Sequence, residues 1–270
     1  MLRSLRFAAL FGGLILSASA LAVDIDAASY GYPLTNPFEA TIATTPPDLR
    51  PELPLDDDID QADRSVTLRP ERAFELPDNF WPVKKLTYRI ATQDKAAPLI
   101  FLIAGTGARY DSSLNEYLKK LYYKAGYHVV QLSSPTSFDF MSAASRFATP
   151  GITKDDAEDM YRVMQAVRAQ NPKLPVTDYY LTGYSLGALD AAFVAHLDET
   201  RRSFNFKKVL LLNPPVNLYT SITNLDRLVQ TEVKGITNTT TFYELVLNKL
   251  TRYFQQKGYI DLNDALLYDF

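Results

Sequence analysis

Apolar and polar positions divide the chain beyond residue 64 into alternating strand and helix patterns. The uninterrupted apolar run Pro98 to Ala104 is typical of a central strand buried on both faces, and Lys208 to Leu212 predicts a further strand that ends at Asn213. Tyr127 to Leu132 and the run that begins at Val176 predict two more strands. A helical pattern separates each strand from the next, so each crossover returns the chain parallel. We therefore predict a doubly wound, mostly parallel α/β sheet.

Two of the crossover helices are predicted from apolar residues that recur every three or four positions. The first begins at Ser113, with Ser113 and Glu116 as a capping box, and ends at Gly126. Its predicted inward face comprises Leu114, Tyr117, Leu118, Leu121, Tyr122 and Ala125. The second begins at Thr153 and ends before Pro172. Its predicted inward face comprises Ala157, Met160, Tyr161, Met164 and Val167.

The two ends of the chain carry other patterns. Residues 1–22 combine Arg3 and Arg6 with an apolar run and an A-x-A site, which predicts a signal peptide cleaved after Ala22. Residues 23–63 hold six prolines and no apolar period, which predicts an extended arm. Residues 64–216 form the predicted core, opened by an antiparallel strand pair at Val66–Leu68 and Leu86–Ile90. Residues 217–270 are wholly helical in pattern and are predicted to be a cap segment.

Composition excludes several classes of function. A net charge of −3 without a basic patch argues against a nucleic-acid partner. Without cysteine the chain has no disulfide, thiolate metal site or cysteine nucleophile, and two histidines cannot build a histidine-rich metal centre. We therefore predict neither a metal nor a cofactor. The signal peptide places the mature chain in the periplasm or outside the cell, with no transmembrane segment.

The main chemical signal is the G-x-S-x-G motif Gly183 to Gly187, which joins a strand pattern to small helix-forming residues. A strand–turn–helix of this kind holds its serine at a strained corner and lifts the hydroxyl clear of the sheet. Glycine is needed at both ends because a Cβ there would collide with a neighbouring strand or the first helical turn. We predict Ser185 as a nucleophile and the backbone N–H of Leu186 as an oxyanion donor.

The loop Gly105 to Gly107 follows a buried strand and has three interpretations. It could begin a dinucleotide-binding turn, but Tyr110 occupies the third glycine position and the next helix starts several residues later. It could be a tight turn without chemistry. In an elbow-type hydrolase this loop supplies the second oxyanion amide, for which Thr106 or Gly107 is well placed. We select Thr106.

The Gly105 to Gly107 loop, the Gly183 to Gly187 elbow and the order of elements resemble the α/β-hydrolase fold family of esterases and lipases. More narrowly, the arm that begins at Tyr30, the run Phe101 to Tyr110 and the run Leu211 to Tyr219 are similar to an exported, largely uncharacterised bacterial branch of that fold. The resemblance implies a serine hydrolase that cleaves an ester or related acyl bond in a small-molecule or lipid-like substrate.

The sequence departs from this family in its histidines. Family members place their triad in the order serine, acid, histidine, yet no histidine follows His196. His196 lies 11 residues after Ser185 on the same predicted helix, about 16 Å along its axis, whereas a general base needs about 3 Å. His128 opens a strand, and we interpret it as structural. The triad acid is left open between Asp226 and another carboxylate.

Two explanations fit the missing base. The one we favour is a fragment that lacks the last strands of the sheet, in which case residues 23–270 alone are expected to be inactive and poorly soluble. The other is a catalytically inactive, hydrolase-like binding or scaffold protein of the periplasm. A nucleotide-dependent enzyme that uses the glycine loop after Ile103 is a third, separate alternative.

Overall fold

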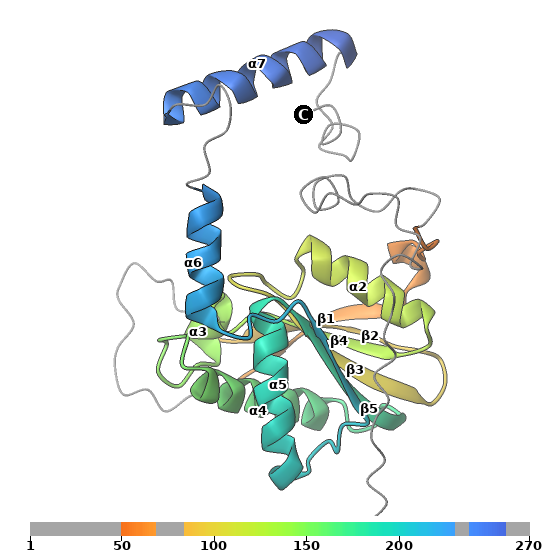
Figure 1. The fold of residues 1–270 in the computed structure, drawn as a ribbon. Coiled ribbons are helices and arrows are strands. Elements are labelled where there is room, and N and C mark those ends of the chain that lie inside the picture. The colour runs from red at the N-terminus through yellow and green to blue at the C-terminus, as the bar shows by residue number, and fades with distance from the viewer. Residues whose placement is uncertain (1–49, 69–83, 230–237, 258–270) are drawn as a thin grey trace, which may run out of the picture. The chain divides into compact units, whose positions relative to one another are not determined.

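The structure is a computed structural model, and it describes residues 50–68, 84–229 and 238–257 (Figure 1). The chain divides into two compact units, Pro51–Gly235 and a second that joins Met1–Arg50 to Ile236–Phe270. The predicted signal peptide and most of the predicted arm lie outside the described residues, as does the end of the predicted cap segment.

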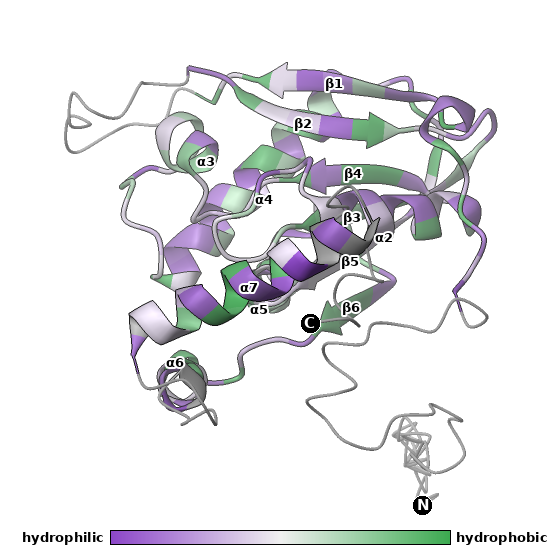
Figure 2. Cartoon of the chain, turned by 90° about the horizontal axis from the view of Figure 1, so that it is seen from above, coloured by the Kyte–Doolittle hydropathy of each residue, from purple (hydrophilic) through white to green (hydrophobic). Residues whose placement is uncertain are grey.

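One six-stranded sheet forms the centre of the unit Pro51–Gly235, in the order β1-β2-β4-β3-β5-β6, which can be followed across Figure 2. The strands are β1 (Gln61–Val66), β2 (Leu86–Ala91), β3 (Ala97–Ile103), β4 (His128–Leu132), β5 (Val176–Tyr184) and β6 (Lys208–Leu212). β4, β3, β5 and β6 run parallel, whereas β2 is antiparallel to both β1 and β4. The predicted α/β class with a mostly parallel sheet is confirmed. The loops after the four parallel strands all emerge at one side of the sheet, which we call the carboxyl edge.

The first strand differs from its prediction. We expected Val66–Leu68, but β1 covers Gln61–Val66 and pairs along its whole length with β2, from Gln61 opposite Ala91 to Val66 opposite Leu86. Of its six residues only Val66 is buried, because β1 is an edge strand. Backbone pairing holds a mostly polar strand that a search for apolar residues does not detect.

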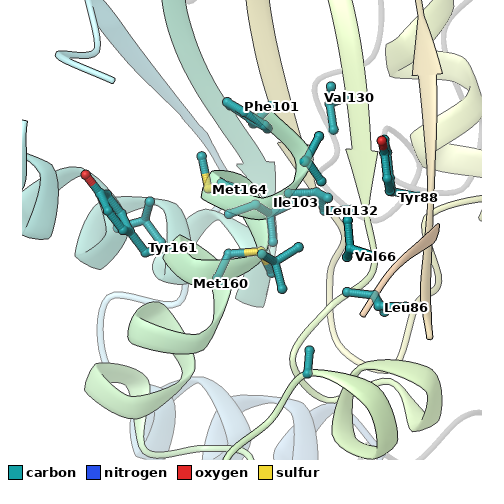
Figure 3. Close-up of a cluster of buried hydrophobic side chains, with 14 of the residues drawn as sticks. Val66, Leu86, Tyr88, Phe101, Ile103, Val130, Leu132, Met160, Tyr161 and Met164 are labelled. Carbon is teal, nitrogen blue, oxygen red and sulfur yellow. The ribbon is translucent and has the colours of Figure 1, made fainter. Parts of the chain in front are cut away.

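Helices cover both faces of the sheet. α4 (Thr153–Gln170), α5 (Leu186–Arg201) and the short α3 (Phe138–Ala143) lie on one face, and α2 (Ser113–Lys124) lies on the other. Alternate residues of β3 divide between them: Phe101 and Ile103 belong to the core shared with α4, and Ile100 faces the α2 side. Figure 3 shows Met160 and Met164 of α4 in the same cluster as Phe101 and Ile103. The predicted inward face of α4 is confirmed, since all five of its residues are buried.

α2 begins where predicted, but its inward face coincides with the predicted one only in part. Its N-cap is Ser112 rather than Ser113, and Glu116 accepts hydrogen bonds from side chains instead of closing a capping box. Part of the predicted face is confirmed, since Leu118 is buried and Leu121 and Tyr122 are partly buried. Leu114, Tyr117 and Ala125, also predicted as inward, are exposed, and the polar residues Asn115 and Lys119 are buried instead. Buried polar partners, rather than apolar contacts alone, therefore set the orientation of this helix.

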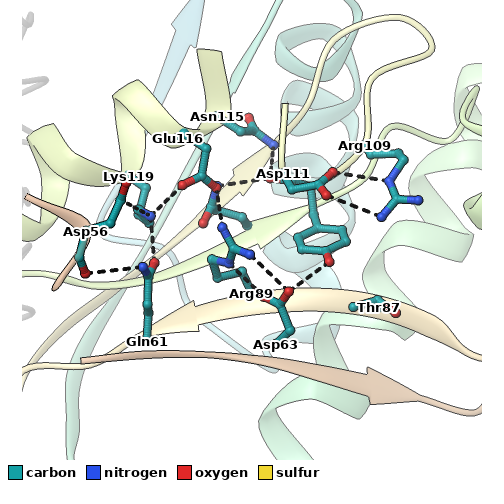
Figure 4. Close-up of polar contacts among 12 residues, drawn as sticks. Asp56, Gln61, Asp63, Thr87, Arg89, Arg109, Asp111, Asn115, Glu116 and Lys119 are labelled. Carbon is teal, nitrogen blue, oxygen red and sulfur yellow. Dashed lines mark hydrogen bonds and ion pairs between the residues drawn. The ribbon is translucent and has the colours of Figure 1, made fainter. Parts of the chain in front are cut away.

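Those partners form a network between α2 and the strands β1, β2 and β4 (Figure 4). The Lys119 ammonium donates to Gln61 Oε1 and Glu116 Oε2, both at 2.6 Å, and lies 3.4 Å from Asp56 in the 3-10 turn Asp56–Asp58. Arg89 pairs with both Glu116 and Asp63. A lysine buried in this way is stabilised by its partners, since an unpaired buried charge is very costly.

After β6 the chain is helical in the residues that the structure describes. α6 covers Leu218–Val229, and α7, which belongs to the other unit, covers Thr239–Lys257. Within the described ranges β6 pairs only with β5, and its Leu210 and Leu211 are 50% and 37% exposed. None of the described helices is long and apolar enough to cross a membrane.

Candidate active site

Ser185 lies at a sharp corner between β5 and α5, at the carboxyl edge of the sheet. β5 ends at Tyr184 and α5 begins at Leu186, so a single residue makes the turn. Ser185 has φ 53° and ψ −126°, a combination that non-glycine residues rarely adopt. Its N–H donates to the Leu212 carbonyl of β6 at 2.9 Å, and its own carbonyl accepts from Ala188 at 3.0 Å. The side chain is exposed.

Close backbone packing explains the two glycines of the motif. A Cβ added to Gly183 would lie 2.2 Å from the carbonyl oxygen of Gly187, so the end of β5 packs directly against the first turn of α5. A Cβ added to Gly187 would lie 2.3 Å from the carbonyl oxygen of Ala104 and 2.4 Å from that of Ile103. Backbone atoms cannot move aside as side chains can, so both positions require glycine.

The loop after β3 lies directly beside Ser185. Ile103, the last residue of β3, pairs with Gly183, and a Cβ added to Gly105 would lie 3.2 Å from Ser185 Cβ. The same Cβ would lie 2.6 Å from Cε2 of Tyr184, whose hydroxyl shares a 3.1 Å hydrogen bond with Ser112 Oγ. The structure therefore brings the predicted loop and the predicted serine together at the carboxyl edge.

The two candidate amides of this loop differ in their hydrogen bonds. The N–H of Gly107 donates to Thr136 Oγ1 at 2.7 Å. Neither the Thr106 N–H nor the Leu186 N–H donates to any acceptor within the described part of the chain. Thr106 is exposed and Leu186 is partly exposed. The amides of Thr106 and Leu186 are thus the ones that remain available to a ligand near Ser185.

Neither histidine can reach Ser185. His128 begins β4 opposite Leu99, at the far end of the strands from the carboxyl edge, about 13 Å away at 3.3 Å per residue. Its Nδ1 accepts from the Gln93 N–H at 3.0 Å, and burial lowers the pKa of His128, which agrees with a structural role. His196 is exposed on α5, where Nδ1 lies 3.1 Å from Glu199.

Two buried carboxyl groups near the starts of α4 and α5 were not found by sequence reasoning. Asp190 is 1% exposed, and its Oδ2 has no hydrogen-bond partner in the described residues. Burial raises the pKa of Asp190 to about 8, and the nearby Asp156 carboxylate adds to the rise. Burial likewise raises the pKa of Asp156 to about 6, although the Gly151 N–H donates to it at 2.7 Å. The one available signal was an acidic residue at position 190 among small apolar ones.

Asp226 and the two surface hollows next to α5 do not belong to the site around Ser185. Asp226, considered above as an acid, is exposed on α6. Two surface hollows of about 340 Å³ and 360 Å³ border α5 near Asp198 and near His196, and neither includes Ser185. The described residues contain no group of three or more side chains suited to a metal ion.

No protein-family model and no curated protein matches the sequence. Solved structures similar to the chain include Est1E from Butyrivibrio proteoclasticus, with 17% identity, a TM-score of 0.37 and coverage of 57% of this chain and 54% of that one. A hyperthermophilic esterase from Pyrobaculum calidifontis has 20% identity, a TM-score of 0.42 and coverage of 62% and 48%. The Pyrococcus furiosus esterase Pf2001 has 13% identity, a TM-score of 0.44 and coverage of 65% and 61%.

The chain spans about half to three fifths of the length of these three structures. At such identities and TM-scores the likeness assigns no chemistry to this chain. The chemistry of its site follows from its own residues.

Proposed function

We propose that this protein cleaves an ester or related acyl bond, with Ser185 as the nucleophile and the backbone N–H groups of Leu186 and Thr106 as oxyanion donors. The observation that carries the proposal is the conformation of Ser185 at its single-residue corner. A backbone in such a region costs about 1–3 kcal/mol and persists where surrounding structure enforces it, which is common at active sites. The glycine contacts on either side are that enforcement.

The reaction assigned to this site is acyl transfer to serine. Ser185 Oγ attacks the acyl carbon, and the two amides stabilise the negative charge that develops on the carbonyl oxygen. The bond to the leaving alcohol then breaks, the alcohol takes up a proton, and water releases the acyl group from Ser185. The substrate class we propose is a small-molecule or lipid-like ester, which is what the resemblance of the Gly105 to Gly107 loop and the Gly183 to Gly187 elbow to those of esterases and lipases implies.

The proton of Ser185 needs a base, and neither imidazole of this chain supplies it. Loss of the triad histidine lowers kcat by about 10⁴ to 10⁶ in serine hydrolases, so turnover by this chain is expected to be very slow. Because Ser185 is exposed, free imidazole in solution has access to it. Added imidazole is therefore expected to replace part of the missing base.

The test is covalent labelling of the whole chain by a fluorophosphonate, which forms a P–O bond to the reactive serine and loses fluoride. We expect a single adduct on Ser185, mapped by mass spectrometry, with a rate that rises with the concentration of neutral imidazole. Ser185→Ala is expected to remove the adduct, whereas Ser203→Ala, at an exposed position beyond α5, is the matched control.

An adduct on a different serine, or one that survives Ser185→Ala, contradicts the assignment of the nucleophile. A chain that stays unlabelled at every imidazole concentration supports the inactive, hydrolase-like binding or scaffold protein instead. Binding of a nucleotide would favour the third alternative, although the amide of Gly107 is already occupied by Thr136.

We also propose export, with a mature chain that begins at Val23 in the periplasm or outside the cell. The support is the pattern of residues 1–22, which ends in the A-x-A site before Val23. Amino-terminal sequencing of the protein from fractionated bacterial cells is expected to give Val23 in the soluble exported fraction. An intact Met1 on membrane-bound protein would identify an uncleaved anchor instead.

A further inference from the structure

We propose that Thr136 is a positioning residue: its hydroxyl holds the amide of Gly107 and thereby directs the neighbouring Thr106 amide to the oxyanion position beside Ser185. The inference rests on the function proposed above, and it adds a residue from the β4–α3 loop that does not touch the reacting atoms. The structural part of the inference can be tested without any reaction.

The contact itself is direct and short. Gly107 N donates to Thr136 Oγ1 at 2.7 Å, across 29 positions of sequence and from a separate loop. Gly107 has φ 68°, which lies in the left-handed region, so the chain reverses at this residue. A hydrogen bond at the turning residue fixes the plane of the peptide bond between Thr106 and Gly107.

The Thr136 hydroxyl is itself oriented. Its Oγ1 lies 2.8 Å from Ser134 Oγ, and Ser134 Oγ also accepts from the Thr136 N–H at 3.2 Å. Since the Thr136 oxygen accepts from Gly107, its own proton can be donated to Ser134. The Ser134 N–H in turn donates to the carbonyl of Ala108 at 2.9 Å. Thr136 and Ser134 thus hold the glycine loop at Gly107 and at Ala108.

A second set of contacts fixes the far end of the same loop. Tyr110 N donates to Ser133 Oγ at 3.0 Å, and Ser133 Oγ donates to Asp139 Oδ2 at 2.8 Å. The Tyr110 hydroxyl donates to Asp63 at 3.0 Å. With Gly105 packed against Tyr184 and Tyr110 held in this way, the peptide plane between Thr106 and Gly107 is the part of the loop that Thr136 holds directly.

The position of one amide matters because oxyanion donors work by fixed geometry. Loss of one such donor costs about 10²- to 10³-fold in rate, and a donor that is present but misaligned costs part of that. With Gly107 N bound to Thr136, the Thr106 N–H is the loop donor left for the substrate oxygen. The Thr106 N–H lies in the preceding peptide plane, whose Gly105 carbonyl accepts from the Ala108 N–H at 3.0 Å, so residues 105–108 form one hydrogen-bonded turn. Release of Gly107 would loosen this turn and would shift the Thr106 donor without removing it.

The experiment compares Thr136→Val, which replaces the hydroxyl by a methyl group of similar size, with Thr136→Ser, which keeps the hydroxyl. Thr87→Val is the matched control, because the Thr87 hydroxyl lies 3.3 Å from Ser65 Oγ in the β1–β2 pair, away from the carboxyl edge. The first readout is amide hydrogen exchange at residues 105–108. We expect faster exchange at Gly107 in Thr136→Val and wild-type exchange in Thr136→Ser and Thr87→Val.

The second readout is phosphonylation of Ser185 at fixed imidazole, resolved into probe affinity and maximal rate. We expect Thr136→Val to lower the maximal rate about tenfold with affinity changed less than about twofold, and Thr136→Ser to restore the rate. Unchanged Gly107 exchange in Thr136→Val overturns the contact, and faster exchange with an unchanged rate overturns the positioning role. Wild-type protein that resists labelling refutes the proposed function and the positioning role with it, while the exchange data still decide whether Thr136 holds the loop.

Discussion

Gly187→Ala is expected to lower the free energy of unfolding by about 3 kcal/mol and to suppress labelling of Ser185. The added methyl group would lie 2.3 Å from the Ala104 carbonyl oxygen and 2.4 Å from that of Ile103. Both atoms belong to the backbone at the end of β3, in the middle of the sheet, so α5 has to move away from the sheet. Overpacking usually costs about 1–3 kcal/mol, and a contact with two backbone carbonyl groups, which cannot move aside, places this variant at the upper end.

The loss of reactivity follows from the same displacement. Ser185 is fixed by the contacts of α5 with β3 and β6, and the Leu186 amide moves with it. Urea unfolding monitored by circular dichroism measures the first effect, and phosphonylation at fixed imidazole measures the second. Gly126→Ala is the control, because a Cβ there meets nothing within 4 Å and only its φ of 89° is unfavourable. A Gly187→Ala protein as stable as Gly126→Ala would show that the corner accommodates a Cβ at position 187.

Strongly patterned elements could be predicted because one physical cause decides them. β6 matches its predicted bounds, because an apolar run this short is typical of a strand and is too short for a helix. α4 presents the predicted face because the apolar residues outnumber any competing polar contacts on that side. The corner at Ser185 was predictable because the motif follows a β-branched and aromatic strand pattern and precedes small helix-forming residues.

What could not be predicted depends on contacts between residues distant in sequence. The inward rotation of Lys119 and Asn115 in α2 needs Gln61, Glu116 and the Tyr110 carbonyl, which come from several different segments. The hydrogen bond from Gly107 to Thr136 is likewise invisible in either loop alone, and it distinguishes Thr106 from Gly107 as the free amide. A periodic pattern reports how apolar surface is buried, whereas these polar contacts are specified by the assembled sheet.

Two buried aspartates of α5 are expected to respond to the same substitution with opposite signs. Asp198 is 3% exposed, and both of its carboxylate oxygens accept hydrogen bonds. They accept from the Tyr161 hydroxyl at 2.6 Å and from the amides of Phe204 and Phe206 at 3.0 and 3.3 Å. Asp190 is equally buried, yet its Oδ2 has no partner within the described residues. Asp198→Asn turns an acceptor into a donor that faces other donors, which costs about 2 kcal/mol of stability.

Asp190→Asn is expected to raise the free energy of unfolding by about 2 kcal/mol at pH 7 to 8. The pKa of Asp190 is about 8 in the folded protein, because burial disfavours its charge, against 3.8 for an ordinary aspartate. The unfolded chain therefore gains from ionising this carboxyl at neutral pH, and at pH 7 the gain is about 4 kcal/mol at 1.36 kcal/mol per unit. Asparagine cannot ionise and removes that gain, while its own buried amide costs about 1–3 kcal/mol.

The pH dependence separates this explanation from a general packing effect. A carboxyl whose pKa is raised on folding contributes stability that is complete below its unfolded pKa near 4 and is lost as pH rises through its folded pKa near 8. The advantage of Asp190→Asn over wild type is therefore expected to vanish near pH 5 and to grow with every step toward pH 8, as measured by urea unfolding at each pH. Asp94→Asn, at an exposed carboxyl, is expected to give a difference near zero throughout. A constant offset between Asp190→Asn and wild type across this range would mean that Asp190 titrates normally, in which case its unpartnered oxygen must be reached by water.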